Sequence, residues 1–401
     1  MGFMKLQSSI PDIKVPRKMV LRVAESSKRS YENRNNEVLI TDEFDEKDAA
    51  GFALSLSRKG LNSQIAQLPA DLNYVAEGDV LRFEPSGRVT VLYRKSSPFN
   101  AMLVTERCNS KCLMCSQPPR DIDDDYLIED WLRVIPLMSS DTPELGITGG
   151  EPTLRFDDLL ALIRSAKEHL PTTALHMLSN GRLFNYLKYV QRMADIQHHD
   201  FMIGIPLYAD VDNIHDFVVQ AKGAFSQTVL GILNLARVRQ KIEIRFVIHR
   251  HTFARMPQFA RFIRRNLPFV DHVTFMGLEI MGYAKSNLDA LWIDPVEYQN
   301  QLEEAVLELA SARIHVSVYN LPLCLLPRSL WPFARKSISD WKNIYFDECD
   351  LCEVRDFCAG FFTSAQVKRS AHIRPLGDTE RRFADSLWNK AANVQVTKSA
   401  S

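Results

Sequence analysis

Three cysteines close together near residue 110 constrain the fold more than any other feature of the chain. Cys108, Cys112 and Cys115 have the spacing C-x3-C-x2-C and follow the apolar run 101–105. Three thiolates on one loop can hold three irons of a four-iron cluster, which leaves the fourth iron without a protein ligand. The alternatives are three buried thiols or a zinc loop, and zinc usually needs a fourth ligand nearby. We therefore expect an iron–sulfur site on a loop that a substrate can reach.

Composition narrows the class of protein. The chain has 401 residues, of which 46% are hydrophobic, and this predicts one large domain with appendages. Lys plus Arg equals Asp plus Glu at 49 each, so no overall field favours nucleic acid. No apolar run reaches membrane-spanning length, and residues 1–6 lack the apolar segment of a secretory signal. We expect a cytoplasmic protein that does not associate with a membrane.

The N-terminal residues 1–97 are expected to form a small, mostly β domain. Its clearest element is a hairpin, in which the runs 78–83 and 88–93 flank a Pro-Ser-Gly turn at 85–87. We expect a structural or docking role for this domain.

Residues 98–320 alternate between strand and helix patterns. The strand candidates are 101–105, 145–148, 174–178, 201–207, 242–248 and 272–276. The helix candidates between them are 127–138, 156–169, 183–196, 228–240 and 256–266. Six alternations predict an α/β fold with parallel strands. A partial (β/α)6 barrel is favoured, with its site at the carboxyl ends of the strands, and a doubly wound open sheet is the competitor.

A second group of cysteines lies in the loop-like segment 321–365. Its members are Cys324, Cys349, Cys352 and Cys358. Four thiolates can fully ligate a second iron–sulfur cluster, and a structural four-cysteine zinc site is the alternative. The odd total of seven cysteines, in two groups, argues against a disulfide framework. The remaining residues, 366–401, form a polar tail with a short helix candidate at 381–389.

Two short segments with glycine end the second and third strand candidates. They are Gly149-Gly150-Glu151-Pro152 and Ser179-Asn180-Gly181. Paired glycines let the backbone approach a ligand closely, and the Glu151 carboxylate can bind an ammonium group. Taken alone, the first segment is better explained as a strand-to-helix turn, and the second can always be a polar turn with glycine at positive φ.

Together, these segments and the first cysteine group resemble the signature of the radical S-adenosylmethionine (radical SAM) superfamily. The resemblance implies a [4Fe–4S] cluster on the first three cysteines, with S-adenosylmethionine on its open iron. It places Gly149 to Pro152 at the amino group of S-adenosylmethionine, and Ser179 and Asn180 near its ribose. The implied activity is reductive cleavage to a 5′-deoxyadenosyl radical. One departure is Met114, where the superfamily often has an aromatic residue.

Further segments narrow the resemblance. They are 105–107, 116–119, 205–210, 215–216, 223–225 and 339–343. With them, residues 78–362 resemble the C-type radical SAM maturase of the His-Xaa-Ser system. This implies a peptide substrate rich in His-Xaa-Ser repeats, a second radical SAM protein as partner, and a protein reductant. It also implies that the second cysteine group is an auxiliary cluster, as on many peptide-modifying radical SAM enzymes.

Several other polar residues are weaker candidates, and no catalytic residue is predicted. Each has a functional and a structural interpretation, and the residues are Tyr208, Asp210, Arg245, His249, His251 and the acidic run 121–125. In the functional interpretation, Tyr208 and Asp210 face a cofactor or substrate. In the structural one, they belong to the apolar core or cap a helix. In the functional interpretation, Arg245 binds a carboxylate of a ligand. The two histidines are expected on a solvated loop rather than in proton transfer, and the acidic run at a helix N-terminus.

Three functions follow from these patterns. The first is radical modification of a peptide, and the second is radical chemistry on a small molecule or RNA. The third is a non-catalytic iron–sulfur or zinc protein that docks a peptide.

Overall fold

The structure is a computed structural model that describes residues 6–10, 13, 15–26, 31–41, 49–59, 66–340 and 342–398. Residues 1–5 and Trp341, which contributed to the predictions above, lie outside the described residues. The chain divides into two compact units. Unit 1 comprises Met1–Arg107, Asp121–Leu178 and Met193–Phe201, and unit 2 comprises Cys108–Arg120, Ser179–Arg192 and Met202–Ser401.

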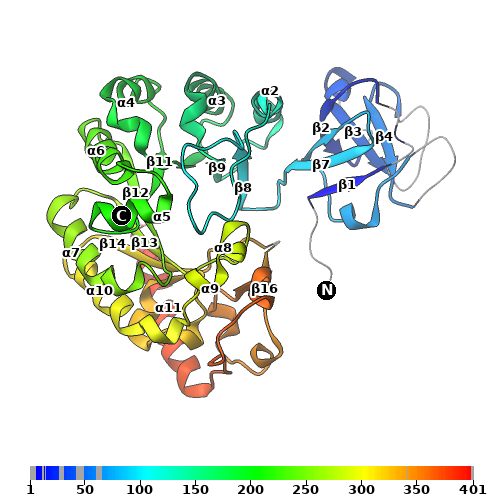
Figure 1. Ribbon diagram of the computed structural model, residues 1–401. Helices are drawn as coiled ribbons and strands as arrows, with labels where there is room; N and C mark the ends of the chain where they lie inside the picture. The colour runs from blue at the N-terminus through cyan, green and yellow to red at the C-terminus, as the bar shows by residue number, and fades with distance from the viewer. Residues whose placement is uncertain are drawn as a thin grey trace. The chain divides into compact units, whose positions relative to one another are not determined.

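Unit 1 begins with a sheet of seven strands, drawn in blue in Figure 1 and ordered β1-β7-β6-β2-β3-β4-β5. The strands are β1 (Gln7–Ser9), β2 (Met19–Ala24), β3 (Glu37–Thr41), β4 (Leu54–Ser57), β5 (Ala66–Gln67), β6 (Val80–Phe83) and β7 (Arg88–Tyr93). The pair β6 and β7 is antiparallel, with Leu81 opposite Val91, so the predicted hairpin is confirmed. An apolar core that includes Val38, Leu56 and Phe83 stabilises the sheet.

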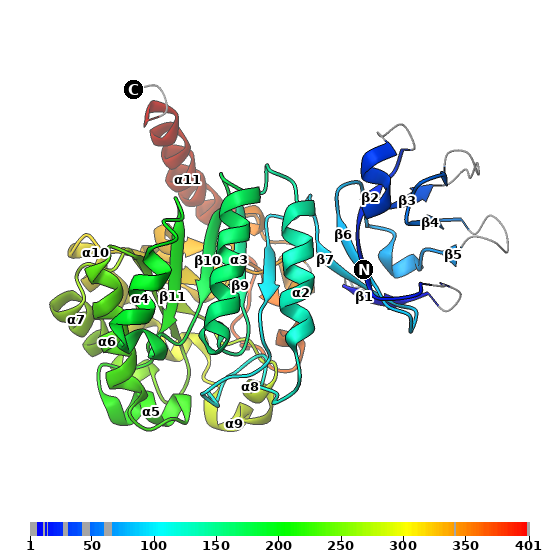
Figure 2. The ribbon, with the colours of Figure 1, turned by 90° about the horizontal axis from the view of Figure 1, so that it is seen from above.

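The second part of unit 1 is three parallel strands with helices. Strands β8 (Asn100–Leu103), β9 (Glu144–Thr148) and β10 (Ala174–Leu178) are hydrogen-bonded in that order. Helices α2 (Asp125–Val134) and α3 (Phe156–His169) lie side by side, as Figure 2 shows. Helix α3 begins and ends at the residues that the apolar periodicity predicts, 156 and 169.

A buried ion pair joins the N-terminal sheet to α2 within unit 1. The Arg82 guanidinium on β6 lies 2.9 Å from the Asp130 carboxylate on α2, and Lys18 lies 3.0 Å from the same carboxylate. The neighbouring Trp131 indole donates to the Leu103 carbonyl of β8 at 2.8 Å. These contacts attach α2 to β6 on one side and to β8 on the other.

Unit 2 holds five parallel strands and most of the helices. The strands pair in the order β11 (Phe201–Pro206), β12 (Lys241–Val247), β13 (His272–Met276), β14 (His315–Tyr319) and β15 (Ala334–Arg335). The helices are α4 (Leu187–Ala194), α5 (Asp212–Val219), α6 (Ala224–Arg237), α7 (Met256–Asn266), α8 (Tyr283–Ser286), α9 (Leu288–Leu291), α10 (Gln299–Ser311) and α11 (Asp378–Lys398). Helices α7 and α10 pack against each other in both views of the ribbon (Figures 1 and 2).

The predicted alternation of parallel strands and helices is confirmed, and the fold is α/β. All six strand candidates are strands, and α7 has the predicted bounds. Helices α5, α8 and α9 were not predicted, because each is at most eight residues long and carries little periodicity. The predicted helix 381–389 is too short, since α11 is 21 residues long. The partial barrel and the boundaries at 97, 320 and 365 stay predictions. Among the described residues, no helix is long and apolar enough to cross a membrane.

Candidate functional site

The paired glycines at the end of β9 bring two backbone segments of unit 1 into close contact. The Gly150 N–H donates to the Thr105 carbonyl at 2.7 Å, and the Glu151 N–H donates to the Arg107 carbonyl at 2.8 Å. A Cβ atom at Gly150 would lie 2.2 Å from the Arg107 carbonyl oxygen, and one at Gly149 would lie 2.7 Å from that of Thr105. Only glycine permits this approach. The two glycines therefore fix the backbone immediately before Cys108.

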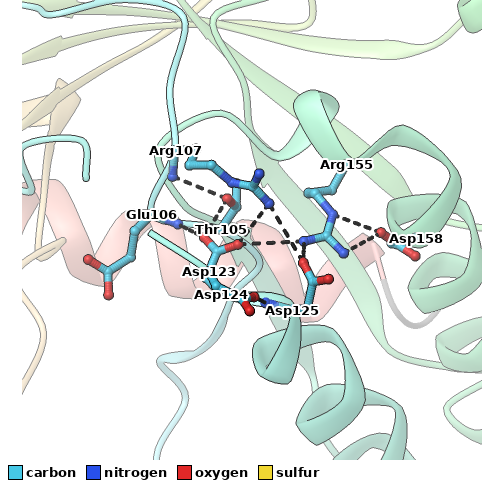
Figure 3. Close-up of polar contacts among 8 residues, drawn as sticks. All are labelled: Thr105, Glu106, Arg107, Asp123, Asp124, Asp125, Arg155 and Asp158. Carbon is cyan, nitrogen blue, oxygen red and sulfur yellow. Dashed lines mark hydrogen bonds and ion pairs between the residues drawn. The ribbon is translucent and has the colours of Figure 1, made fainter. Parts of the chain in front are cut away.

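The same segment is held from its other side by Asp124 (Figure 3). This carboxylate is fully buried and accepts hydrogen bonds from the Thr105 hydroxyl and the Glu106 N–H, both at 2.7 Å. The Arg107 guanidinium donates to it at 3.1 Å. Burial alone would raise the pKa of Asp124, but these hydrogen bonds and the Arg107 charge outweigh it and hold the pKa below its usual value.

Arg155 extends this network, and no sequence pattern pointed to it. Its guanidinium binds Asp125 and Asp158, and lies 3.5 Å from the Asp124 carboxylate. The acidic run was expected to cap a helix or to be solvated. Asp124 does occupy the N-cap position of α2, but its side chain makes no cap hydrogen bond. It binds the segment 105–107 instead, and the Asp123 side chain accepts from the Asp125 N–H at the helix N-terminus at 3.2 Å.

Glu151 has a structural partner. It is fully buried, and one of its carboxylate oxygens accepts from the Thr153 N–H at 3.0 Å and from the Thr153 hydroxyl at 2.6 Å. This caps the short 3-10 turn Pro152–Arg155. The contact of Glu151 with an ammonium group stays a prediction. Its hydrogen bonds in the structure are those of a residue that caps a turn.

The first cysteine loop lies in unit 2 and is bound there along its whole length. The Lys111 and Leu113 N–H groups donate to carbonyls at the end of α5, at 3.1 and 2.9 Å. The Tyr283 N–H donates to the Cys115 carbonyl at 2.8 Å. Gly282 has a φ of +52°, and a Cβ there would lie 2.5 Å from the Cys115 carbonyl oxygen. The turn before α8 therefore needs glycine in order to reach the loop.

The predicted Ser179-Asn180-Gly181 segment also contacts the cysteine loop. The Asn180 side-chain amide donates to the Asn109 side chain at 2.6 Å. The next residue, Arg182, donates to the Asn109 carbonyl at 2.6 Å and to the Ser110 hydroxyl at 3.1 Å. Arg182 was missed in the sequence because a lone arginine after a turn carries no signal. The roles of Ser179 and Asn180 near a ribose stay predictions.

The three thiols of the loop lie close enough to influence one another. Burial, with Cys115 and Cys108 nearby, raises the pKa of Cys112 to about 12, so its thiol is neutral at pH 7 unless a cation binds. All seven cysteines are free. Within the described part of the chain, no three Cys, His, Asp or Glu side chains converge on a single point suited to one metal ion. A four-iron cluster binds each thiolate at a different iron, so the donor type fits the predicted cluster.

Met114 belongs to an apolar cluster beneath the loop. It is 6% exposed and packs with Tyr208, Val218 and Leu291, among others. Tyr208 therefore has the core role that was its alternative interpretation. Burial, with Cys112 and Cys115 nearby, raises the pKa of its phenol.

The adjacent residues His215 and Asp216 organise the end of β11 and the start of α6. The buried His215 ring accepts from the Tyr208 N–H through Nδ1 at 3.2 Å and stacks on the Tyr208 ring. Asp216 accepts from the Gly223 and Phe225 N–H groups at 2.5 and 2.8 Å, which caps α6. Burial lowers the pKa of His215 to about 4, so the ring is neutral at pH 7.

The remaining candidates have internal partners or are buried. Asp210 forms two hydrogen bonds with Arg255, at 2.8 and 2.6 Å. Arg245 pairs with the buried Glu243 at 2.8 Å, so the carboxylate it meets is internal. The solvated loop expected for His249 is wrong, because His249 is fully buried. Burial, with His251 nearby, lowers the pKa of His249 to about 3.

The second cysteine group also lies in unit 2. Burial, with Cys358, Cys349 and Cys352 nearby, raises the pKa of Cys324 to about 12. The Cys358 sulfur accepts from the Leu323 N–H at 3.5 Å and from the Gly360 N–H at 3.4 Å. A pair of two-residue strands, β16 (Asn343–Ile344) and β17 (Phe361–Phe362), closes the segment. The four thiols are therefore close in space, because the other three each contribute to the raised pKa of Cys324.

Replacing Gly150 with Ala should lower the free energy of unfolding by about 3 kcal/mol, because the new methyl group overlaps the Arg107 carbonyl. Urea unfolding measures this. Gly377→Ala is the matched control, since nothing lies within 4 Å of its Cβ position. Equal stability of the two variants would contradict the close approach.

Acid should destabilise the metal-free chain partly through His215. Below pH 6.5 the unfolded chain takes up a proton at this residue, whereas the folded chain does not until about pH 4. Stability is therefore lost as pH falls through this window, by up to about 3 kcal/mol. His215→Asn should show a correspondingly smaller loss in urea unfolding between pH 7 and 4. The exposed His169→Asn is the control, and parallel profiles for all three proteins would refute the burial argument.

Comparison with known proteins gives one family match and several similar structures. Residues 102–263 match the model described as the Radical SAM superfamily. No curated protein matches the chain. SuiB from Streptococcus suis bound to S-adenosylmethionine has a TM-score of 0.45 and 16% identity, over 54% of this chain and 49% of SuiB. The chain thus spans about half the length of SuiB.

Two other similar structures are radical SAM proteins or bind AdoMet. A radical SAM methyltransferase from Sphaerobacter thermophilus has a TM-score of 0.42 and 14% identity, over 60% of this chain and 73% of that one. The structure of anSMEcpe with bound AdoMet and Cp18Cys peptide has a TM-score of 0.41 and 17% identity, over 54% and 62%. The family match spans the first cysteine group and both glycine segments. The chain therefore contains a radical SAM superfamily domain.

Proposed function

We propose that this chain is an enzyme that cleaves S-adenosylmethionine and modifies a peptide by radical chemistry. The observation that carries the proposal is the cysteine loop 108–115, which lies inside the matched domain and is bound by hydrogen bonds along its length. Bound to its three thiolates, a [4Fe–4S] cluster would supply the electron that cleaves S-adenosylmethionine to a 5′-deoxyadenosyl radical. The protein supplies binding, orientation and exclusion of water.

The proposed cofactor-binding residues divide by role. Cys108, Cys112 and Cys115 hold the cluster. The part-exposed backbone of Gly149 and Gly150 receives the amino group of S-adenosylmethionine.

The next two residues, Glu151 and Pro152, act mainly by shaping that turn, because Glu151 is buried on Thr153. Ser179 and Asn180 lie near the ribose in this proposal. Asn180 and Arg182 already bind the loop, so they also fix the orientation of the three thiols.

The peptide substrate rests on the resemblance to the C-type maturase of the His-Xaa-Ser system. We propose a substrate with His-Xaa-Ser repeats, a second radical SAM protein as partner and a protein reductant. Radical chemistry on a small molecule or RNA is the second candidate among enzymes. A non-catalytic iron–sulfur or zinc protein that docks a peptide is the third candidate.

For the second cysteine group we propose an iron–sulfur cluster ligated by Cys324, Cys349, Cys352 and Cys358. Its co-occurrence with the first group favours iron over zinc. Because Cys358 also accepts two backbone hydrogen bonds, this cluster would brace the segment that follows β14.

Replacing Cys112 with Ala should abolish production of 5′-deoxyadenosine, since only two cluster thiolates remain on the loop. The assay uses protein reconstituted anaerobically with iron and sulfide, S-adenosylmethionine and dithionite. Ser116→Ala, an exposed change on the same loop, is the control and should retain activity. Full activity of the Cys112 variant would refute the ligand assignment, and an inactive wild-type protein would refute the enzyme itself.

Replacing Cys352 with Ala should reduce bound iron from about eight to about four per chain while cofactor cleavage persists. Metal analysis of the reconstituted proteins measures this. Four irons and one zinc in the wild-type protein would establish the zinc alternative. Unchanged iron in the variant would remove Cys352 from the ligand set.

A further inference from the structure

A small cavity of about 80 Å³, lined by apolar and polar side chains, lies in unit 2 where three neighbouring strands end. Ile248 follows β12, Leu278 follows β13 and Leu321 follows β14, and all three line it. In α/β folds, ligands bind beyond the carboxyl ends of parallel strands. The cavity is therefore at the functional end of this sheet.

Another part of the cavity lining comes from the segment that contains the second cysteine group. Leu325 and Phe361 line the cavity, and they stand one and three residues after Cys324 and Cys358. The Cys358 sulfur accepts from the Leu323 N–H and the Gly360 N–H, so the cysteine group and the cavity wall are one structure. A ligand bound by the second cysteine group would therefore also stabilise this part of the cavity lining.

The size and lining of the cavity decide what can enter. Pockets for drug-sized ligands have about 300–1,000 Å³, so this cavity is too small for S-adenosylmethionine. Its lining includes Trp292, Ile293 and Phe361, and this apolar part of the lining favours apolar groups over water. The volume suits one branched or unbranched aliphatic side chain.

Two exposed residues that line the cavity, Lys368 and Arg369, are cationic. The Lys368 ammonium lies 4.7 Å from the centre of the Trp292 ring, and among the described residues no carboxylate pairs with it. Arg369 lies over the Phe346 ring, and its nearest carboxylate, Glu348, is 3.5 Å away with both side chains well exposed. An anion next to the cavity would therefore be attracted, and a cation repelled.

We propose that this cavity anchors one aliphatic side chain of the peptide substrate, and that Lys368 binds a carboxylate directly beside it. This inference rests on the proposed function and adds a recognition rule to it: an aliphatic residue next to an acidic group. The carboxylate comes from an Asp or Glu side chain or from the end of the peptide.

The test uses ten-residue fluorescein-labelled peptides with a Gly-Ser background and a central Leu-Glu, Gly-Glu or Leu-Gln pair. All three are amidated, and a fourth peptide ends on Leu with a free carboxylate. Fluorescence anisotropy with the reconstituted protein measures affinity. Leu-Glu should bind about tenfold more tightly than Gly-Glu, from burial of one side chain, and about threefold more tightly than Leu-Gln. The fourth peptide shows whether a terminal carboxylate serves as well.

Two variants connect these preferences to the cavity. Ala365→Phe, which fills the cavity from its lining, should reduce the affinity for Leu-Glu to that for Gly-Glu. Lys368→Gln should remove the preference for Glu over Gln, whereas the exposed Lys336→Gln should leave it unchanged. If the Ala365→Phe protein fails to retain iron, the comparison of Lys368→Gln with Lys336→Gln decides whether the proposal holds. Equal binding of Leu-Glu and Gly-Glu by the wild-type protein, or an unchanged preference in Lys368→Gln, would overturn the proposal.

Failure of the cavity proposal can be told apart from failure of the proposed function. Cleavage of S-adenosylmethionine without any peptide preference refutes the cavity and leaves the enzyme. Peptide preference without cleavage supports the cavity and refutes the enzyme.

Discussion

The site depends on a close backbone contact between Gly150 and the segment 105–107. An ordinary residue at position 150 would overlap the Arg107 carbonyl, and this carbonyl is one peptide unit from Cys108. Two backbone hydrogen bonds hold the segment on one side and the buried Asp124 holds it on the other. The backbone that leads into the cysteine loop is thus fixed by groups of unit 1 that have no need to touch a cofactor.

The cysteine loop itself is bound by the same means in unit 2. Backbone groups from α5 and from the turn at Gly282 take its N–H and carbonyl groups, and Arg182 binds its outer part. The apolar cluster around Met114 lies beneath it. A loop with so many partners loses little conformational freedom when a ligand binds, which favours binding.

Strand periodicity predicted the α/β class, and motif spacing singled out the cysteine loop and the segment 179–181, which contacts it through Asn180. Helices α3 and α7 were predictable because their apolar residues repeat over several turns. The short helix α5 was not, since eight residues contain too few repeats. Asp124, Arg155 and Arg182 could not be assigned because each acts on a residue distant in the chain. His249 was misjudged for the related reason that burial comes from packing and not from local polarity.

The network around Asp124 has a consequence for how such a chain can evolve. Thr105, Arg107 and Arg155 all bind the same carboxylate or its immediate neighbour, so a change at one of them leaves a buried charge with fewer partners. Neutral drift at these positions is restricted, and a substitution at one survives mainly when another compensates for it. In relatives of this chain, the four positions should therefore change together or not at all.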